Sequence, residues 1–488
     1  MTKFMSVLDA AFLHMESHDT PMHVAGLQIF SHPENAASDY MQKLVQHLRN
    51  VTELAAPWNQ KLRRSPESKV LPSWQTDSDV DMEYHVRHLS LPQPGGERQL
   101  GELISRLHSH RLSQRRPLWE CHVIEGVENN RFALFIKIHH SLVDGVTAMR
   151  LLVRALATDA NTTTAAPWSA SYQQSGGEVA EPRFKKIASQ MKALPEVAKA
   201  YGKLAMSAVG NSGTLVAPML APRSVLNVSV SGQRRFATQH FSLGRIKAVA
   251  RAAGVTVNDV VLAVCSTSLR RFLKESNNLP RRSLTAMVPV SLRGKSGGGA
   301  GGNAVGAIVA SLATDVADPK RRLLNIAADT ANAKAHLASM SAEAAGQYSN
   351  LFMVPVVLQA ATRVAAGIRP YFNVTISNVP GPAEPLYLMG ARMEAMYPVS
   401  VPTHGQCLNI TCTSYAGKVN FGFTACRDAL PHMQNIAVYA QDALLEIEQA
   451  YGLNIESSSA TEGAAKTRKK PQQKLQPSRV PLNSGDIA

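Results

Sequence analysis

The chain has 488 residues, of which 45% are hydrophobic and 18% charged, so two domains that each bury a core are the natural expectation. Its net charge of +15 favours anionic lipid or the phosphates of coenzyme A as partners, because no helix-turn-helix, zinc-finger or aromatic-basic motif supports nucleic acid. The five cysteines form no CxxC pair, and no apolar run approaches the roughly eighteen residues of a membrane-spanning helix, which indicates a cytosolic protein with reduced thiols and, at most, peripheral membrane contact.

The pattern up to about residue 160 predicts an α/β unit. Apolar residues at helical spacing predict helices, and alternating or strand-forming runs predict strands. We expect helices at residues 6–15, 39–49 and 102–111, and strands at residues 21–30, 117–125 and 132–138, with strand-like pieces between 74 and 91.

A histidine motif follows the strand at 132–138. Residues 139–145 read HHSLVDG and lead into an apolar helical pattern. Adjacent side chains on extended backbone point to opposite faces, so one of His139 and His140 can face a cavity while the other packs inside. Histidine titrates near neutrality and can take a proton from a hydroxyl, so we interpret the motif as a general-base site. The alternatives are two packed histidines beside a helix cap, or a metal site with Asp144, which is disfavoured because neighbouring strand side chains diverge.

The segment at 161–233 is predicted to be a linker that contains a basic amphipathic helix. Its first part is rich in Thr, Ser, Ala and Gly, and at 183–204 six basic residues oppose the single acid Glu196. Such a helix can lie on an anionic membrane. Packing of this helix against its own protein is an equally weighted alternative.

A second α/β unit is predicted at 234–455. Helices are expected at 241–251, from about 254, and at 319–338, 341–366 and 431–451; strands are expected at 284–290, 305–314 and 372–377, with a hairpin at 408–425. Thr256 and Asp259 have the spacing of a helix N-terminal capping box. The glycine run at 297–302 lacks the Lys-Ser/Thr of a P-loop and is interpreted as a flexible connection. Residues 456–488 are predicted to be a disordered basic tail.

These residues resemble the bacterial wax ester synthase/acyl-CoA:diacylglycerol acyltransferase family. The resemblance extends from the start to about Leu453 and rests on short motifs spread along the chain. They are PMHV (21–24), PLW (117–119), HHxxxDG (139–145), VNDVV (257–261), VPVSLR (288–293), GN (302–303) and ISNVPGP (376–382). HHxxxDG alone specifies only a superfamily, and its combination with PLW and SNVPGP is more specific.

The resemblance implies an α/β fold of two chloramphenicol-acetyltransferase-like domains, each a mixed β-sheet flanked by helices, with the active site in a tunnel between them. It implies an O-acyltransferase that moves a fatty acyl group from acyl-CoA to a long-chain alcohol or diacylglycerol. Acyl-CoA is a substrate, and no cofactor or metal is expected. The enzyme is expected in the cytoplasm, in peripheral contact with the inner face of the membrane and with lipid inclusions. The oligomeric state is left open.

The resemblance also assigns roles to individual residues. His140 would be the general base, without an acyl-enzyme, and Asn258 would donate a hydrogen bond at the reacting centre, although an asparagine there can also be a helix-start residue. His139 and Asp144 would maintain the geometry, with Asp144 paired to an arginine, for which Arg293 is the candidate.

Pro117 and Trp119, with Ser377 and Asn378 in the segment 377–382, would shape the tunnel and bind substrate. The Pro-Gly-Pro run at 380–382 can also be a simple turn.

Two other functions stay open from the residues. A condensation domain acting on carrier-bound thioesters shares HHxxxDG, but no carrier or adenylation domain is attached within the 488 residues. A non-catalytic lipid-droplet coat protein would use the basic helix and tail, and the intact HHxxxDG argues against it.

Overall fold

The computed structural model describes residues 3–5, 7–51, 53–63, 72–169, 221–291, 305–341, 344–345, 347–348 and 369–453. They belong to one compact unit, Met1–Leu453. The basic helix predicted at 183–204, the glycine run at 297–302, Arg293, most of the helix predicted at 341–366 and the tail from 456 lie outside the described residues.

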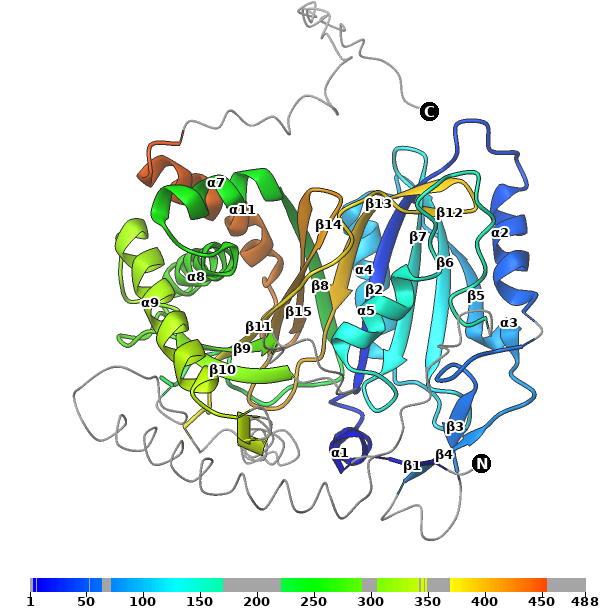
Figure 1. Cartoon of the computed structure of the whole chain (residues 1–488), viewed down its shortest axis with the longest axis horizontal. Coiled ribbons are helices and arrows are strands. Elements are labelled where there is room, and N and C mark those ends of the chain that lie inside the picture. The colour runs from blue at the N-terminus through cyan, green and yellow to red at the C-terminus, as the bar shows by residue number, and fades with distance from the viewer. Residues whose placement is uncertain are drawn as a thin grey trace, which may run out of the picture. The chain divides into compact units, whose positions relative to one another are not determined.

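The first six-stranded sheet contains the strand that ends in the histidine motif (Figure 1). Its strand order is β12 (Tyr387–Leu388), β13 (Ala391–Val399), β2 (His23–Ser31), β7 (Arg131–His139), β6 (Trp119–Val127) and β5 (Val86–Ser90). All neighbours are antiparallel except β5 and β6. One face packs on α2 (Tyr40–Arg49) and α5 (Gly145–Val153) and the other on α4 (Glu97–Ser109). Because both faces are buried, β7 is nearly continuous in apolar residues.

Small elements cover the end of this sheet where β2 begins and β7 ends. They are α1 (Val7–Met15), α3 (Met82–His85) and a three-stranded sheet of β1 (Lys3–Phe4), β4 (Ser73–Thr76) and β3 (Gln60–Leu62). Met15 and Met22 form a small apolar cluster that includes Phe12 and Val401. This cluster holds α1 against the beginning of β2.

The second six-stranded sheet has helices over one face. Its order is β10 (Val305–Ser311), β9 (Thr285–Ser291), β11 (Val374–Val379), β14 (Leu408–Tyr415), β15 (Lys418–Cys426) and β8 (Arg234–Ser242). β11 runs parallel to both of its neighbours and the other pairs are antiparallel. The helices are α7 (Leu243–Ala253), α8 (Val257–Glu275), α9 (Pro319–Ala338) and α11 (Gln434–Ala450), and Figure 1 shows them together on one side. Their apolar side chains form one core with alternate residues of the strands.

Two strands from the second half of the chain complete the first sheet. β13 pairs along β2, with Val399 opposite Ala25, and β12 follows β13 at the edge. The sheets therefore do not follow the simple division of the chain at residues 160 and 234. That division and the tunnel between the units stay predictions.

Close backbone contact joins the two sheets where β13 crosses β15. A Cβ atom built on Gly422 would lie 1.8 Å from the carbonyl oxygen of Pro398. At the edge of the second sheet, the amides of Arg234 and Phe236 in β8 donate to the hydroxyls of Ser109 and Ser105 in α4, at 2.9 Å each. The hydroxyls satisfy edge-strand donors that have no strand partner.

Most predicted elements are confirmed, but several strands escaped prediction, of which β8 and β13 are the longest. Residues 241–251 were expected to be helical from Phe241, but Phe241 is still in β8 and α7 begins at Leu243. β8 carries polar residues because it is an edge strand, so its alternation is weak. The sequence pattern predicted no element for β13. Its apolar face becomes recognisable only when the strand is seen paired with β2.

The helices described here give no single membrane-spanning candidate. α7 and α8 reach the length and apolar character of a membrane span only when taken together, and they meet at a bend of 101°. Both contribute side chains to the second core.

Replacement of Gly422 is expected to destabilise the fold. In Gly422→Ala the new methyl group meets backbone rather than a movable side chain, so we expect a loss of about 1–3 kcal/mol in the free energy of unfolding. Gly101→Ala in α4 is the matched control, because its Cβ would sit 3.5 Å from the Phe236 carbonyl, an ordinary contact. Denaturant unfolding measures both variants, and equal stability of Gly422→Ala and wild type would contradict the close crossing.

Candidate active site

The histidine motif is fixed at the end of β7 by main-chain bonds from two neighbouring segments. The amide of His139 donates to the carbonyl of Leu118, and the amide of His140 donates to the carbonyl of Met22, both at 2.9 Å. Leu118 is the middle residue of PLW, and Met22 belongs to PMHV. Two of the motifs noted in the sequence therefore hold the third in place.

His139 is part of a buried chain of hydrogen-bonding groups. Its Nδ1 lies 2.6 Å from the hydroxyl of Ser141 and accepts the Ser141 amide at 3.1 Å. Because Nδ1 accepts a main-chain N–H, the ring proton belongs on Nε2. Nε2 is 3.6 Å from Oε1 of Glu16, and both side chains are at most 1% exposed.

Glu16 is the acid that sequence reasoning missed. Oε1 accepts a hydrogen bond from the main-chain amide of Met22 at 3.4 Å, and Oε2 accepts one from the side-chain Nε2 of Gln114 at 3.0 Å. Burial alone would raise the pKa of Glu16, but the hydrogen bond and charge of His139, with the Gln114 and Met22 bonds, outweigh it and lower this pKa. Glu16 is therefore a buried carboxylate that braces His139 and the segment bound to His140.

His140 has different surroundings. Its ring stacks on Phe12 of α1, with centroids 4.0 Å apart and planes inclined by 18°. Nδ1 is buried without a hydrogen-bond partner among the described residues. Burial lowers the pKa of His140, and the charge of His139 acts in the same direction. The nearby carboxylates of Asp144 and Asp9 oppose the shift without cancelling it, so the ring is a neutral base near pH 7.

Asp144 and Gly145 begin the helix that follows the motif. Asp144 caps α5: Oδ1 accepts the Thr147 amide at 2.8 Å and Oδ2 the Thr147 hydroxyl at 3.2 Å. The pairing predicted with Arg293 falls outside the described residues. Gly145 has no left-handed φ, and a Cβ built on it would meet nothing within 4 Å, so neither backbone strain nor packing requires a glycine there.

The structure brings Asn258 and Asn378 together. Asn258 is in the first turn of α8, and its Oδ1 accepts Nδ2 of Asn378 from β11 at 3.5 Å. The capping box predicted from Thr256 and Asp259 is present, and Asp259 also accepts the hydroxyl of Thr330 at 2.6 Å. No hydrogen bond joins Asn258 to the motif within the described residues.

The segment at 377–382 is more than a turn. Ser377 and Asn378 are in β11, which ends at Val379, and a Cβ on Gly381 would lie 2.3 Å from the carbonyl oxygen of Ser414. The Ala416 amide donates to the carbonyl of Pro382 at 3.1 Å. This close packing on the β14–β15 hairpin starts the crossover to β12 and β13.

Pro117 and Trp119 are buried. Trp119 is 0% exposed and its indole N–H donates to the carbonyl of Trp58 at 2.7 Å. Its ring contacts Trp58, Trp168 and His85. A side chain lining an open tunnel would keep some exposed surface, so this placement favours a structural role over a substrate contact.

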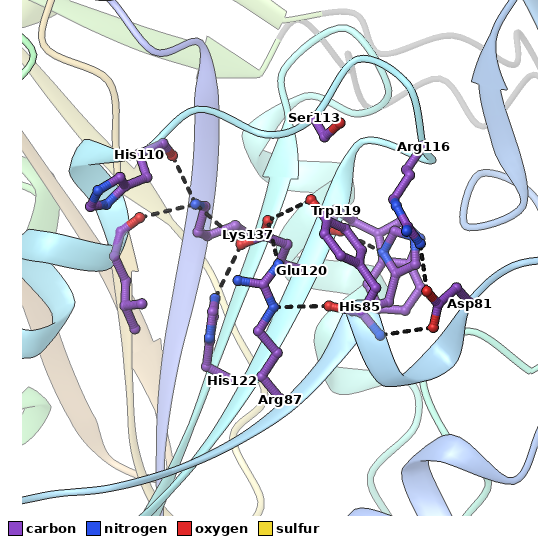
Figure 2. Close-up of polar contacts among 12 residues, drawn as sticks. Asp81, His85, Arg87, His110, Ser113, Arg116, Trp119, Glu120, His122 and Lys137 are labelled. Carbon is purple, nitrogen blue, oxygen red and sulfur yellow. Dashed lines mark hydrogen bonds and ion pairs between the residues drawn. The ribbon is translucent and has the colours of Figure 1, made fainter.

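A second polar cluster lies on β6 and β7, where Lys137 is two residues before the motif (Figure 2). Nζ of Lys137 donates to the carbonyls of Leu107 and His110 at 2.9 Å each and lies 3.5 Å from Glu120. Burial opposes ionisation of Glu120, but His122, Lys137 and Arg87 outweigh it and lower the pKa of Glu120 to about 2. The cluster thus satisfies buried charges by pairing. Among the residues described, no group of three or more His, Cys, Asp or Glu side chains could hold a metal ion.

The arrangement supports a base rather than a nucleophile. Ser141, His139 and Glu16 have the residue types of a hydrolytic triad, but Ser141 is 3% exposed and His139 0%, so a substrate carbonyl has no access. All five cysteines are buried, and burial raises the pKa of Cys265 to about 12. His140 is half-buried, which makes it the less enclosed of the motif's two histidines.

The helical spacing of α1 contained the signal for the missed residues. Asp9 and Phe12 are three residues apart on α1, and Glu16, four residues after Phe12, directly follows the last residue of this helix. The sequence placed Phe12 with Leu8 and Met15 on the apolar side of the helix expected at 6–15, and it did not connect Phe12 with the acids on either side of it. An aromatic residue flanked by two acids at this spacing is the pattern that would have indicated a contact with the histidines.

Comparison with known proteins agrees with this geometry. Residues 5–261 match the wax ester synthase/diacylglycerol acyltransferase catalytic domain, and residues 301–448 match the C-terminal domain of the same family. A putative diacylglycerol O-acyltransferase of Mycobacterium tuberculosis is 41% identical over 484 residues, covering 91% of this chain and 97% of the relative. The solved wax ester synthase/diacylglycerol acyltransferase from Marinobacter aquaeolei is 39% identical, with a TM-score of 0.75, covering 92% of this chain and 100% of that one.

A more distant likeness concerns the fold alone. The first condensation domain of the CDA synthetase is 13% identical, with a TM-score of 0.55 over 92% of this chain and 96% of that domain. The predicted fold class, two chloramphenicol-acetyltransferase-like α/β units with mixed sheets, is confirmed. The chain belongs to the wax ester synthase/diacylglycerol acyltransferase family.

Proposed function

We propose that this O-acyltransferase transfers a fatty acyl group from acyl-CoA to a long-chain alcohol or diacylglycerol, and that His140 is the general base of the reaction. The observation that supports this most is the state of His140: a neutral imidazole, with its pKa lowered by burial, whose backbone is fixed by Met22. A general base must be unprotonated at working pH and held in place. His140 meets both conditions.

The reaction needs one proton carrier. His140 takes the hydroxyl proton of the acceptor while that oxygen attacks the thioester carbonyl carbon, which gives a tetrahedral oxyanion and an imidazolium. The oxyanion collapses, the carbon–sulfur bond breaks, and the thiolate of coenzyme A takes the proton back from the imidazolium. Acyl-CoA is a substrate in this scheme, which requires neither a cofactor nor an acyl-enzyme.

Asn258 is proposed to donate to the oxyanion. Its Oδ1 accepts the hydrogen bond from Asn378, which orients the amide and leaves its NH₂ group as the donor. A donor fixed in advance costs no reorganisation when charge develops. Asn378 and Ser377 would then act through Asn258 and the end of β11 rather than as primary substrate contacts.

Peripheral membrane association belongs to the same proposal. Both substrates are lipids, and the chain carries basic residues at 183–204 and in the tail from 456. Cationic segments attract anionic lipid surfaces. We therefore place the enzyme on the cytoplasmic face of the membrane and on lipid inclusions.

Removal of the base is expected to abolish turnover. His140→Ala should lower thiol release from palmitoyl-CoA plus hexadecanol, or plus diacylglycerol, by about 10²–10⁴-fold. His432→Ala, at an exposed position of the second half, is the matched control and should keep wild-type rates. An inactive wild type, or equal rates for His140→Ala and wild type, would overturn the mechanism.

The open space beside Gly145 is expected to receive substrate. Gly145→Ala has no steric conflict and should leave the melting temperature unchanged or slightly raised, since alanine is favoured over glycine in helices. The added methyl group should raise KM for palmitoyl-CoA or lower kcat/KM. Gly101→Ala, at a described helical glycine whose added Cβ would make only an ordinary contact, controls for a general effect. Wild-type kinetics in Gly145→Ala would show that the space is not used.

Membrane association should depend on lipid charge. In flotation assays the full chain should bind vesicles of phosphatidylcholine with phosphatidylglycerol, and raising the ionic strength should release it. A variant with the six basic residues of 183–204 changed to glutamine should bind less. Equal binding to pure phosphatidylcholine, or undiminished binding of the variant, contradicts a role for this segment's charge.

A further inference from the structure

Phe12 is the residue of α1 that touches the proposed base. Its ring lies nearly parallel to that of His140, with 4.0 Å between the centroids, and Phe12 also packs against the buried pair Met15 and Met22. Packing against these two methionines and the imidazole restricts the orientation of the phenyl ring. The contact is therefore a fixed stack of two aromatic faces and not an edge contact between mobile side chains.

We propose that Phe12 is a positioning residue that stabilises the imidazolium form of His140 through the face of its ring. The proposal rests on the proposed function, in which His140 becomes positively charged as the oxyanion forms. The face of a phenyl ring carries negative partial charge from its quadrupole and attracts a cation within about 6 Å. The attraction grows as the proton moves to His140, so it favours the transition state over the ground state.

The other charged groups around His140 come from three elements. His139 at the end of β7 opposes a positive charge, whereas Asp144 at the start of α5 and Asp9 on α1 favour it. Glu16 faces His139 at 3.6 Å. The carboxylate of Asp144 already accepts two hydrogen bonds from Thr147. The group that stacks directly on the imidazole is the ring of Phe12.

Packing alone makes a different prediction. If Phe12 only excludes water, its loss would admit solvent to His140, and the pKa of His140 would rise towards its ordinary value because burial is what lowers it. If the ring stabilises the imidazolium, its replacement by an aliphatic side chain would lower the pKa of His140 further. The two roles move the acid limb of the pH profile in opposite directions.

The test compares Phe12→Leu, Phe12→Tyr and Phe132→Leu in the full chain with palmitoyl-CoA and hexadecanol. Phe12→Leu keeps an apolar wall and should lower kcat by about 2- to 30-fold, with KM for palmitoyl-CoA little changed and the acid limb of kcat shifted to lower pH. Phe12→Tyr keeps the ring face and should restore kcat and the acid limb. Phe132 stacks on Phe30 at the far end of β7, so Phe132→Leu controls for lost core packing and should change only the melting temperature.

Three outcomes overturn the inference while leaving the proposed function intact: Phe12→Leu with wild-type kcat and acid limb, an acid limb that shifts to higher pH, or Phe12→Tyr as impaired as Phe12→Leu. Each requires an active wild type and an inactive His140→Ala. An inactive wild type, or an active His140→Ala, instead refutes the proposed function itself.

Discussion

The site depends on the pairing of β2 with β7. His23 lies opposite His139 in that register, so the chain just before β2 runs beside the motif and the Met22 carbonyl receives the His140 amide. Because α1 precedes β2 by a few residues, the same pairing holds Phe12 and Glu16 against the two histidine rings. A slip by one residue would turn every side chain of β7 to the opposite face. Burial of both faces of the sheet prevents that slip, which makes the first core a condition for the chemistry.

The second half of the chain forms one six-stranded sheet and also adds two strands to the sheet of the first half. The segment at 377–382 packs on the β14–β15 hairpin and then sends β12 and β13 to pair beside β2. The crossing of β13 over β15 is close enough to require Gly422. Asn258, braced by Asn378, lies in the half that this crossover ties to the histidine strand. We infer that the crossover sets the position of a donor on one half relative to a base on the other.

The elements with strong local signals were predictable from sequence. β7 and the start of α5 follow from an apolar run that meets a cap residue, and the α8 capping box follows from Thr256 and Asp259. The residues around the base were less accessible, because stacking of Phe12 on His140 and bracing of His139 by Glu16 join positions more than a hundred residues apart. Trp119 is a different case, because its motif is recognisable in the sequence but its role is not. Only the packing of Trp119 against Trp58 and Trp168 shows that it supports the core.

In the proposed mechanism the two histidines of the motif have different roles. His139 is locked between Ser141 and Glu16, and its burial removes it from substrate while its neighbours fix the local backbone. His140 keeps an unpartnered Nδ1 among the described residues, a stacked ring and a lowered pKa. This division explains why a Ser-His-Glu set beside the reacting centre need not act as a nucleophilic triad.

Direct acyl transfer, with no covalent intermediate on Ser141 or any other side chain, is the central claim. The most direct test is the intact mass of the protein after incubation with palmitoyl-CoA in the absence of an acceptor, quenched within the first turnovers. The account predicts an unmodified mass and no burst of free thiol. A mass increase of one palmitoyl group that disappears when hexadecanol is added would contradict it.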